Sequence, residues 1–153
     1  MRTNVLRFDR DYAEVEKMKI SGTFSRIDID PRYSQLQHIR LRSFKLVEIN
    51  FQDFTRFPNL QVLNLGFNRI STIHGYDSLL QLDKLTQLLL MFNELEEFDL
   101  TFVPPSINTL LLHKNPIASV NCGALKQLTL LEDFMVSGAL TSFDFDCLPA
   151  PYE

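Results

Sequence analysis

The chain has 153 residues, of which 45% are hydrophobic and 22% charged, and its formal net charge is −4. These values are typical of one folded globular domain, and they exclude a disordered chain and two full-sized domains. The weak charge gives no reason to expect a nucleic-acid partner, and no apolar run is long enough to predict membrane insertion.

Residues 1–35 are predicted to form a degenerate first repeat or an N-terminal cap. Val15, Met18 and Ile20 have the spacing of a pattern that recurs through the rest of the chain, and RIDID follows from Arg26. The start MRTNVLRFDRDYAEVEK has no apolar core of a signal peptide, so the chain as given is not expected to carry one.

From residue 36 to 148, one pattern recurs and reads L-x-x-L-x-L-x-x-N-x-L, with Ile at some Leu places. Clear copies begin at Leu60, Leu85 and Ile107, and fainter copies begin at Leu36 and Leu131. The starts at 36, 60, 85, 107 and 131 are therefore 24, 25, 22 and 24 residues apart. Residues 149–153 are left as a C-terminal tail, which is too short to cap an open core edge. We therefore expect another chain to cover that end, or a longer protein to continue it.

The pattern has a physical basis. Side chains of a strand alternate between its two faces, so the first, fourth and sixth places of each copy are predicted to point inward. The ninth place holds Asn68, Asn93 and Asn115, whose amides are expected to form a ladder of backbone hydrogen bonds. A short helix is expected after Tyr76, capped by Asp77, whereas the prolines in VPPS exclude a helix there.

This consensus and this period identify the chain as a member of the leucine-rich-repeat family. The implied fold is an α/β solenoid: a short, curved, right-handed coil with a parallel β-sheet on the concave face and loops or short helices on the convex face. Units such as LVEINFQDFTRFPN resemble the typical animal extracellular class. The segment PSINTLLLHKNPIASVNC is similar to part of the secreted leucine-rich immune proteins of mosquitoes, a resemblance that implies extracellular recognition of protein partners.

Outward places of the strands, namely the third, fifth, seventh and eighth of each repeat, are where solenoids usually bind. They are basic in the N-terminal repeats, apolar in the central ones, and they supply the candidate binding residues Arg40, Arg42, Phe67, Leu89, Met91, Phe92, Leu111, His113 and Met135. Scattered exposed apolar residues are common, and a slip of one residue would turn these inward. The Asn column argues against a slip, so we predict a protein-binding surface, with a homodimer contact as one form of it.

The basic outward residues allow two interpretations. Lys17 and Lys19, together with Arg40 and Arg42, either hold an acidic or phosphorylated ligand or form a solvated edge. Cys122 and Cys147 occupy nearly equivalent places on neighbouring coils, so they form either a disulfide or two buried free thiols.

Catalysis is not expected, because no nucleophile or carboxylate has a place beside a histidine base. No metal site or cofactor is predicted either, since the spacing of a zinc site is missing. The favoured function is a non-catalytic recognition module that binds protein through its concave face, in an extracellular innate-immune setting. The alternative is an intracellular scaffold or regulatory subunit of the same fold.

Overall fold

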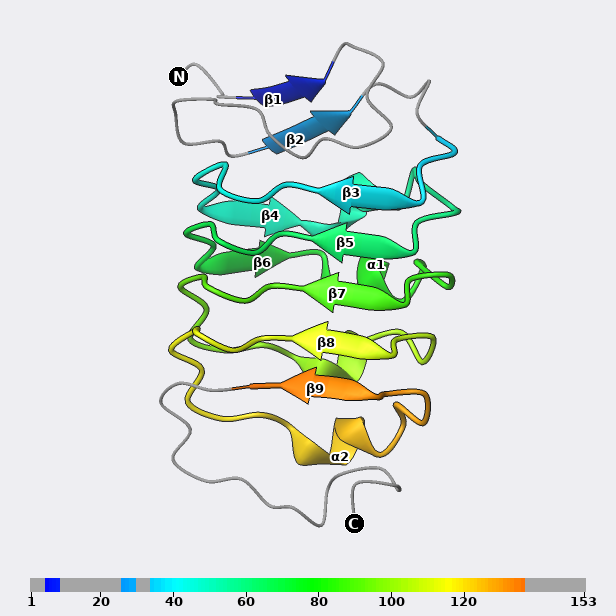
Figure 1. Ribbon diagram of the computed structural model, residues 1–153, viewed down its shortest axis with the longest axis vertical. Coiled ribbons are helices and arrows are strands. Elements are labelled where there is room, and N and C mark those ends of the chain that lie inside the picture. Colours follow the sequence, from blue (N-terminus) through cyan, green and yellow to red (C-terminus); the bar gives the residue numbers. More distant parts are fainter. Residues whose placement is uncertain (1–4, 9–25, 30–33, 137–153) are drawn as a thin grey trace.

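The computed structural model describes residues 5–8, 26–29 and 34–136. Successive coils of the chain stack along the long axis of the molecule (Figure 1). One side is a five-stranded parallel sheet with strand order β3 (His38–Arg40), β5 (Val62–Asn64), β7 (Gln87–Leu89), β8 (Thr109–Leu111) and β9 (Asp133–Met135).

Each strand consists of the third, fourth and fifth residues of one predicted repeat. The Leu and Ile side chains at the first, fourth and sixth places of the three central repeats are buried between the sheet and the opposite side. Phe51, Phe54 and Phe57 fill the same core from the returning segment. The predicted leucine-rich-repeat solenoid with a parallel sheet and short helices is therefore confirmed.

The Asn column forms the predicted ladder. Asn93 accepts a hydrogen bond from the Ile70 amide at 2.9 Å and donates to the carbonyls of Leu90 and Leu65, at 2.9 and 3.1 Å. Asn115 repeats this arrangement one coil further on, and Asn68 repeats it one coil earlier. Each side-chain amide thus closes the turn of its own coil and ties it to the preceding coil.

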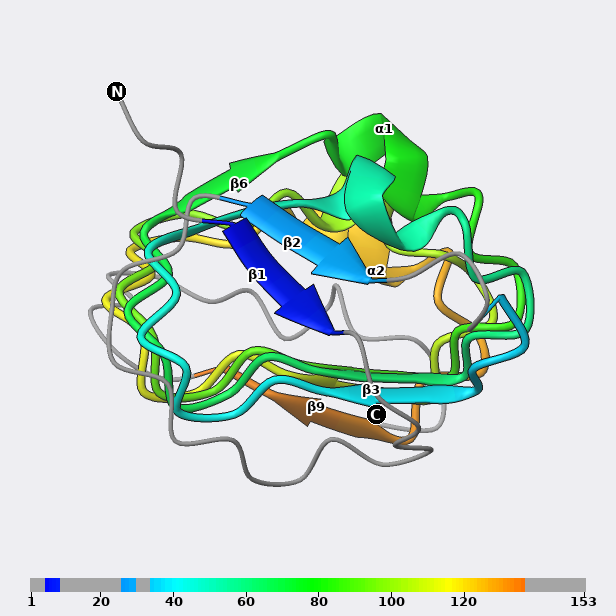
Figure 2. The same cartoon turned by 90° about the horizontal axis from the view of Figure 1, so that it is seen from above.

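The convex side is more regular than expected. Besides the short helices α1 (Tyr76–Leu79), α2 (Cys122–Leu125), η2 (Phe51–Phe54) and η3 (Leu100–Phe102), it contains a second parallel sheet of β4 (Glu48–Asn50) and β6 (Thr72–His74). Figure 2 shows these elements on the opposite side of the coil from the five-stranded sheet.

The predicted helix after Tyr76 exists, but its predicted cap is wrong. Gly75 is the residue before the first turn of α1, it has a φ of 64°, and Asp77 lies within the first turn. A side chain at Gly75 would collide with Oδ1 of Asn50, which accepts the Gln52 amide at 3.0 Å and caps η2. Neighbouring coils therefore share one tight junction, and this junction requires glycine.

At the N-terminal end, β1 (Val5–Phe8) pairs in parallel with β2 (Arg26–Ile29), and β2 lies against β4. Residues Arg26–Ile29 of the RIDID segment thus form a strand. The predicted strand around Val15, Met18 and Ile20 lies outside the described residues. The assignment of residues 1–35 to a first repeat or cap stays a prediction.

Removing one amide of the ladder should destabilise the whole coil. We expect Asn93→Ala to lower the free energy of unfolding by about 2–4 kcal/mol, because it leaves the buried Ile70 amide without a partner and removes one of the two side-chain donors from each of the Leu65 and Leu90 carbonyls. Asn121→Ala, at an exposed asparagine, is the matched control, with an expected loss below about 0.5 kcal/mol. Urea unfolding measures both, and equal losses would contradict a structural role for the ladder.

Tyr76 lies at the centre of an aromatic cluster on the convex side. Its ring packs edge-on against Phe51 and Phe98, with centroids 5.9 and 5.6 Å apart, and tilted against Phe102 at 6.1 Å. Burial raises the pKa of Tyr76 to about 12; a backbone hydrogen bond at Asp99 opposes the shift, and nearby carboxylates add to it.

This shift predicts a loss of stability at high pH. The unfolded tyrosine ionises near pH 10, whereas the folded one stays neutral to about 12. Its contribution is therefore complete below about pH 10 and disappears as the pH rises through about 12. Tyr76→Phe keeps the ring and removes the titration, so its stability should fall less between those values. If the free energy of unfolding fell equally with pH in the wild type and in Tyr76→Phe, the raised pKa of Tyr76 would be contradicted.

Candidate binding surface

The sheet register places equivalent residues of successive repeats side by side. One row across the five strands reads Arg40, Asn64, Leu89, Leu111 and Met135, each the Cα partner of the next. Because the residues preceding them in the strands point into the core, this row lies on the outer face of the sheet. We call this outer face the sheet face; it is the predicted concave face.

Along this row, the sheet face changes from polar to apolar. Arg40 is half-buried and Asn64 is buried, with its Oδ1 accepting the Gly66 amide at 3.1 Å. Leu89 and Leu111 are half-buried, and Met135 is 53% exposed. The last three form a continuous apolar strip across β7, β8 and β9.

Three outward places of one repeat, Val62, Asn64 and Gly66, do not reach solvent as expected. Val62 and Asn64, both on β5, are buried. The side-chain oxygen of Asn64 accepts the Gly66 amide of the following turn, so Asn64 stabilises the fold and is not available to a partner. The structure therefore separates the predicted basic and apolar zones at β5. Of the predicted basic cluster, only Arg40 and Arg42 lie within the described residues.

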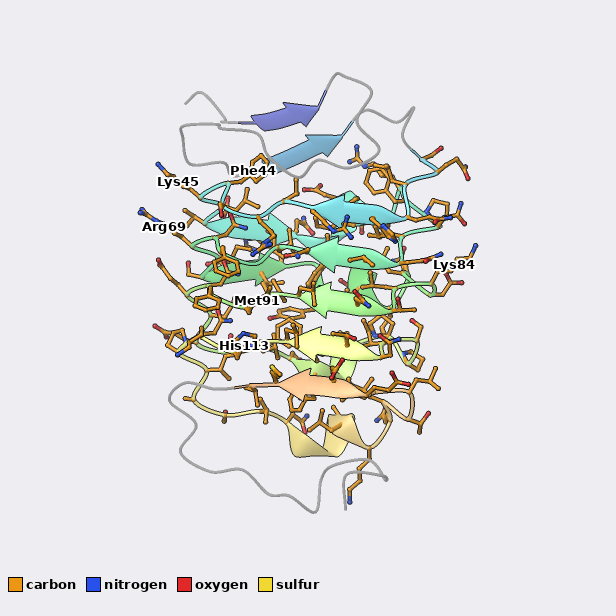
Figure 3. The ribbon with its side chains drawn as sticks, viewed as in Figure 1. Phe44, Lys45, Arg69, Lys84, Met91 and His113 are labelled. Atoms are coloured by element: carbon orange, nitrogen blue, oxygen red, sulfur yellow. The ribbon has the colours of Figure 1, made fainter. Side chains whose placement is uncertain are left out.

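The Met91 side chain packs against Gly66 of the preceding coil. A Cβ atom added at Gly66 would lie 2.8 Å from the Met91 Sδ, so the missing side chain of one coil leaves room for the methionine of the next. Met91 is half-buried as a result. It extends the apolar strip toward the ends of the strands (Figure 3).

A column of stacked groups lies just beyond the strand ends. The Arg42 guanidinium carbon is 4.6 Å from the centroid of the Phe67 ring. Phe67 stacks on Phe92 with centroids 4.4 Å apart and planes 13° apart, and Phe92 meets His113 edge-on at 5.8 Å. We call these four residues the ring ladder. All four were predicted as binding residues, but their stacking was not; the sequence signal is phenylalanine at the eighth place of two successive repeats.

The backbone makes these phenylalanines costly. The eighth places Ser43, Phe67, Phe92 and Lys114 have φ values of 62°, 59°, 55° and 59°, which is the left-handed region. The turn imposes this conformation on these four coils, and glycine or asparagine adopts it with the least strain. Even so, the rings of Phe67 and Phe92 remain 39% and 41% exposed. Neither the turn nor the core requires phenylalanine here.

Basic side chains accompany the ring ladder at the edge where the strands end. Lys45 and Arg69, the tenth places of two successive repeats, are exposed and extend from this edge, whereas Lys84 lies at the opposite edge (Figure 3). The next tenth place is Glu94, which is also exposed. At the far end of the ladder, His113 Nδ1 is buried without a hydrogen-bond partner in the described part of the chain.

Other predicted sites receive less support from the described residues. Cys122 begins α2, but its side chain and all of Cys147 lie outside the described residues, so both alternatives, a disulfide and two free thiols, stay open. Within residues 5–8, 26–29 and 34–136, no group of three or more His, Cys, Asp or Glu residues could hold a metal ion. No helix in those ranges is long and apolar enough to cross a membrane.

Comparison with known proteins agrees with this architecture. Residues 34–95 match the leucine rich repeat family. The chain is also similar to the solved structure of a leucine-rich-repeat protein from Leptospira interrogans, with a TM-score of 0.53 and 26% identity. That comparison covers 71% of this chain and 28% of the Leptospira chain, so this chain spans about a quarter of that structure. No curated protein matches the chain.

The described residues form a repeat solenoid with a parallel sheet along one side. The repeat match over residues 34–95 and the Asn ladder agree in type: the fold is that of a leucine-rich-repeat solenoid. Domains of this kind are generally protein-interaction modules and typically non-catalytic.

The ring ladder should be removable without unfolding the protein. Phe92→Asn loses a stack worth about 0.5–1.5 kcal/mol but relieves left-handed strain of about 1 kcal/mol or more. We therefore expect the free energy of unfolding to change by less than about 1 kcal/mol. Leu88→Ala in the core is the contrast, with an expected loss of about 2–5 kcal/mol. If Phe92→Asn lowered the free energy of unfolding as much as Leu88→Ala does, the Phe92 ring would be needed for stability, which contradicts the prediction.

Proposed function

We propose that the protein is a non-catalytic recognition module that binds a protein partner through the sheet face. The observation that carries the proposal is the apolar strip of Leu89, Leu111 and Met135, extended by Met91 and Phe92, on the outer side of a hydrogen-bonded sheet. A soluble domain gains nothing from apolar side chains at places where the fold accepts polar ones.

The surroundings of the strip favour a protein partner. The neighbouring row contains Gln87, Thr109 and Asp133, which provides a polar rim beside an apolar centre, as protein interfaces have. Burying an apolar side chain of this size contributes about 1.5–3 kcal/mol before the costs of association. Three to five such residues are enough for a specific contact.

The arrangement of titratable groups supports a non-catalytic role. His38 and His113 belong to the coils of β3 and β8, which are separated in the sheet by β5 and β7. Two further coils between them prevent the imidazoles from acting on one substrate.

Charge introduced into the apolar strip should abolish partner binding. We expect the double variant Leu89→Asp with Leu111→Asp to lose association, because burying two carboxylates against an apolar partner is strongly unfavourable. The matched control is Leu80→Asp with Leu130→Asp, which places the same charges on exposed leucines away from the strip. Affinity capture with wild type, variant and control, each checked for folding by circular dichroism, compares them. Undiminished capture by the folded strip variant would refute the proposal.

A second copy of the chain is one partner that this surface could accept. Sedimentation over a range of concentrations distinguishes self-association from binding to a different protein. A dimer that dissociates in the Leu89 and Leu111 variant would identify the partner as another copy.

We further propose an extracellular, innate-immune setting. It is supported by the likeness of residues 105–122 to secreted leucine-rich immune proteins of mosquitoes and by the 24-residue repeats. A signal peptide encoded upstream of Met1 would support this setting. A complete transcript that starts at Met1 would favour an intracellular scaffold of the same fold.

A further inference from the structure

We propose that the ring ladder and its basic edge bind an extended acidic segment of the partner protein. In this arrangement a carboxylate of the segment pairs with Arg42, and an apolar side chain a few residues away packs on Phe92. The inference rests on the proposed protein-binding function and specifies the chemistry of the partner and the part of the surface that recognises it.

Arg42 is prepared to receive a carboxylate. Its guanidinium lies over the Phe67 ring, and the side chain is exposed. An aromatic ring attracts a cation through its face. The N–H groups of the guanidinium point outward from the guanidinium's own edge, so contact with the ring leaves donors available for a carboxylate. Such a pair forms two parallel hydrogen bonds. Because the ring already restrains Arg42, binding costs less side-chain entropy than at a free arginine.

The charge around the ladder complements an acidic partner. Lys45 and Arg69 project from the edge where the strands end (Figure 3), and Arg42 follows the end of β3 by two residues. The chain as a whole nevertheless has a net charge of −4. The basic character is therefore local. At the next coil the tenth place is Glu94, and Phe92 and Met91 supply apolar surface; the next exposed basic residue, Lys114, lies one coil further on. A ligand must accordingly be acidic at one end and apolar toward the other.

The dimensions suit an extended strand of peptide. Parallel strands lie about 4.8 Å apart, so the three steps from the coil of Arg42 to that of His113 span about 14 Å. An extended chain rises about 3.3 Å per residue, and about four residues cover this length. A carboxylate on Arg42 then places the side chain two or three residues further on against Phe92. From there the peptide continues onto the apolar strip at Met91.

The residues themselves indicate that the ladder serves binding. Phe67 and Phe92 occupy left-handed positions that glycine or asparagine would fill with less strain, and about two-fifths of each side chain remains exposed. Strained, bulky and exposed residues in successive coils are expected where a ligand completes their burial.

The test selects random linear peptides, displayed on phage, against the full chain. The selected peptides are then synthesised with a fluorescent label and titrated against wild type, Arg42→Gln, Phe92→Asn and Lys84→Gln. Lys84→Gln is the matched control, because it removes an exposed positive charge from the opposite edge of the sheet. The double variant Leu89→Asp with Leu111→Asp is included, and circular dichroism verifies that every variant is folded.

We expect the selected peptides to combine acidic residues with an aromatic or aliphatic residue within about four positions. Arg42→Gln and Phe92→Asn should each weaken binding by about tenfold or more, and Lys84→Gln by less than about twofold. Affinity should also fall as salt is added, because the charged groups lie at the surface.

Several results would overturn the inference. They are selected peptides without acidic residues, a failure to select any peptide, or equal effects of Arg42→Gln and Lys84→Gln. Binding to a glycan array in place of peptides would assign the rings to a carbohydrate instead. If the ladder variants bind normally and the Leu89 and Leu111 variant does not, the ladder inference fails while the proposed function stands. If every variant still captures a partner protein, both the ladder inference and the proposed function of the sheet face are wrong.

Discussion

The side-chain amides of Asn68, Asn93 and Asn115 are the interaction on which the rest of the molecule depends. Where each strand ends, the chain turns sharply, and its backbone groups point into the core, where water cannot reach them. Each amide offers two donors and an acceptor at that point, and each binds backbone groups of its own coil and of the coil before it. The stacking register of the solenoid follows from this geometry.

The register decides which side chains become neighbours on the outer face. Since neighbouring coils are in register, side chains separated by 21 to 25 residues in the sequence meet as a row or a column. Leu89, Leu111 and Met135 become one apolar strip in this way, and Arg42, Phe67, Phe92 and His113 become one ladder. The eighth place has the same left-handed conformation whether the residue is Ser43, Phe67, Phe92 or Lys114. The turn therefore does not require phenylalanine, and the two rings affect the outer surface.

The two zones of the surface have different physical characters, and together they describe a partner. In the proposed function, the strip contributes apolar area beside a polar row. The ladder would contribute a guanidinium held over a ring, which selects for negative charge.

The sequence by itself determined the fold class, the inward Leu and Ile places, the Asn ladder and the residues of the outer face, because a repeated pattern reports the periodic geometry of its coil. It did not predict the second sheet of β4 and β6, the glycine junction at Gly75, or the burial of Val62 and Asn64. The stacking of Arg42 on Phe67, and of Phe67 on Phe92, was likewise decided only by the tertiary structure. These features arise from contacts between coils, and such contacts depend on side-chain direction and backbone handedness, which spacing along the chain does not specify.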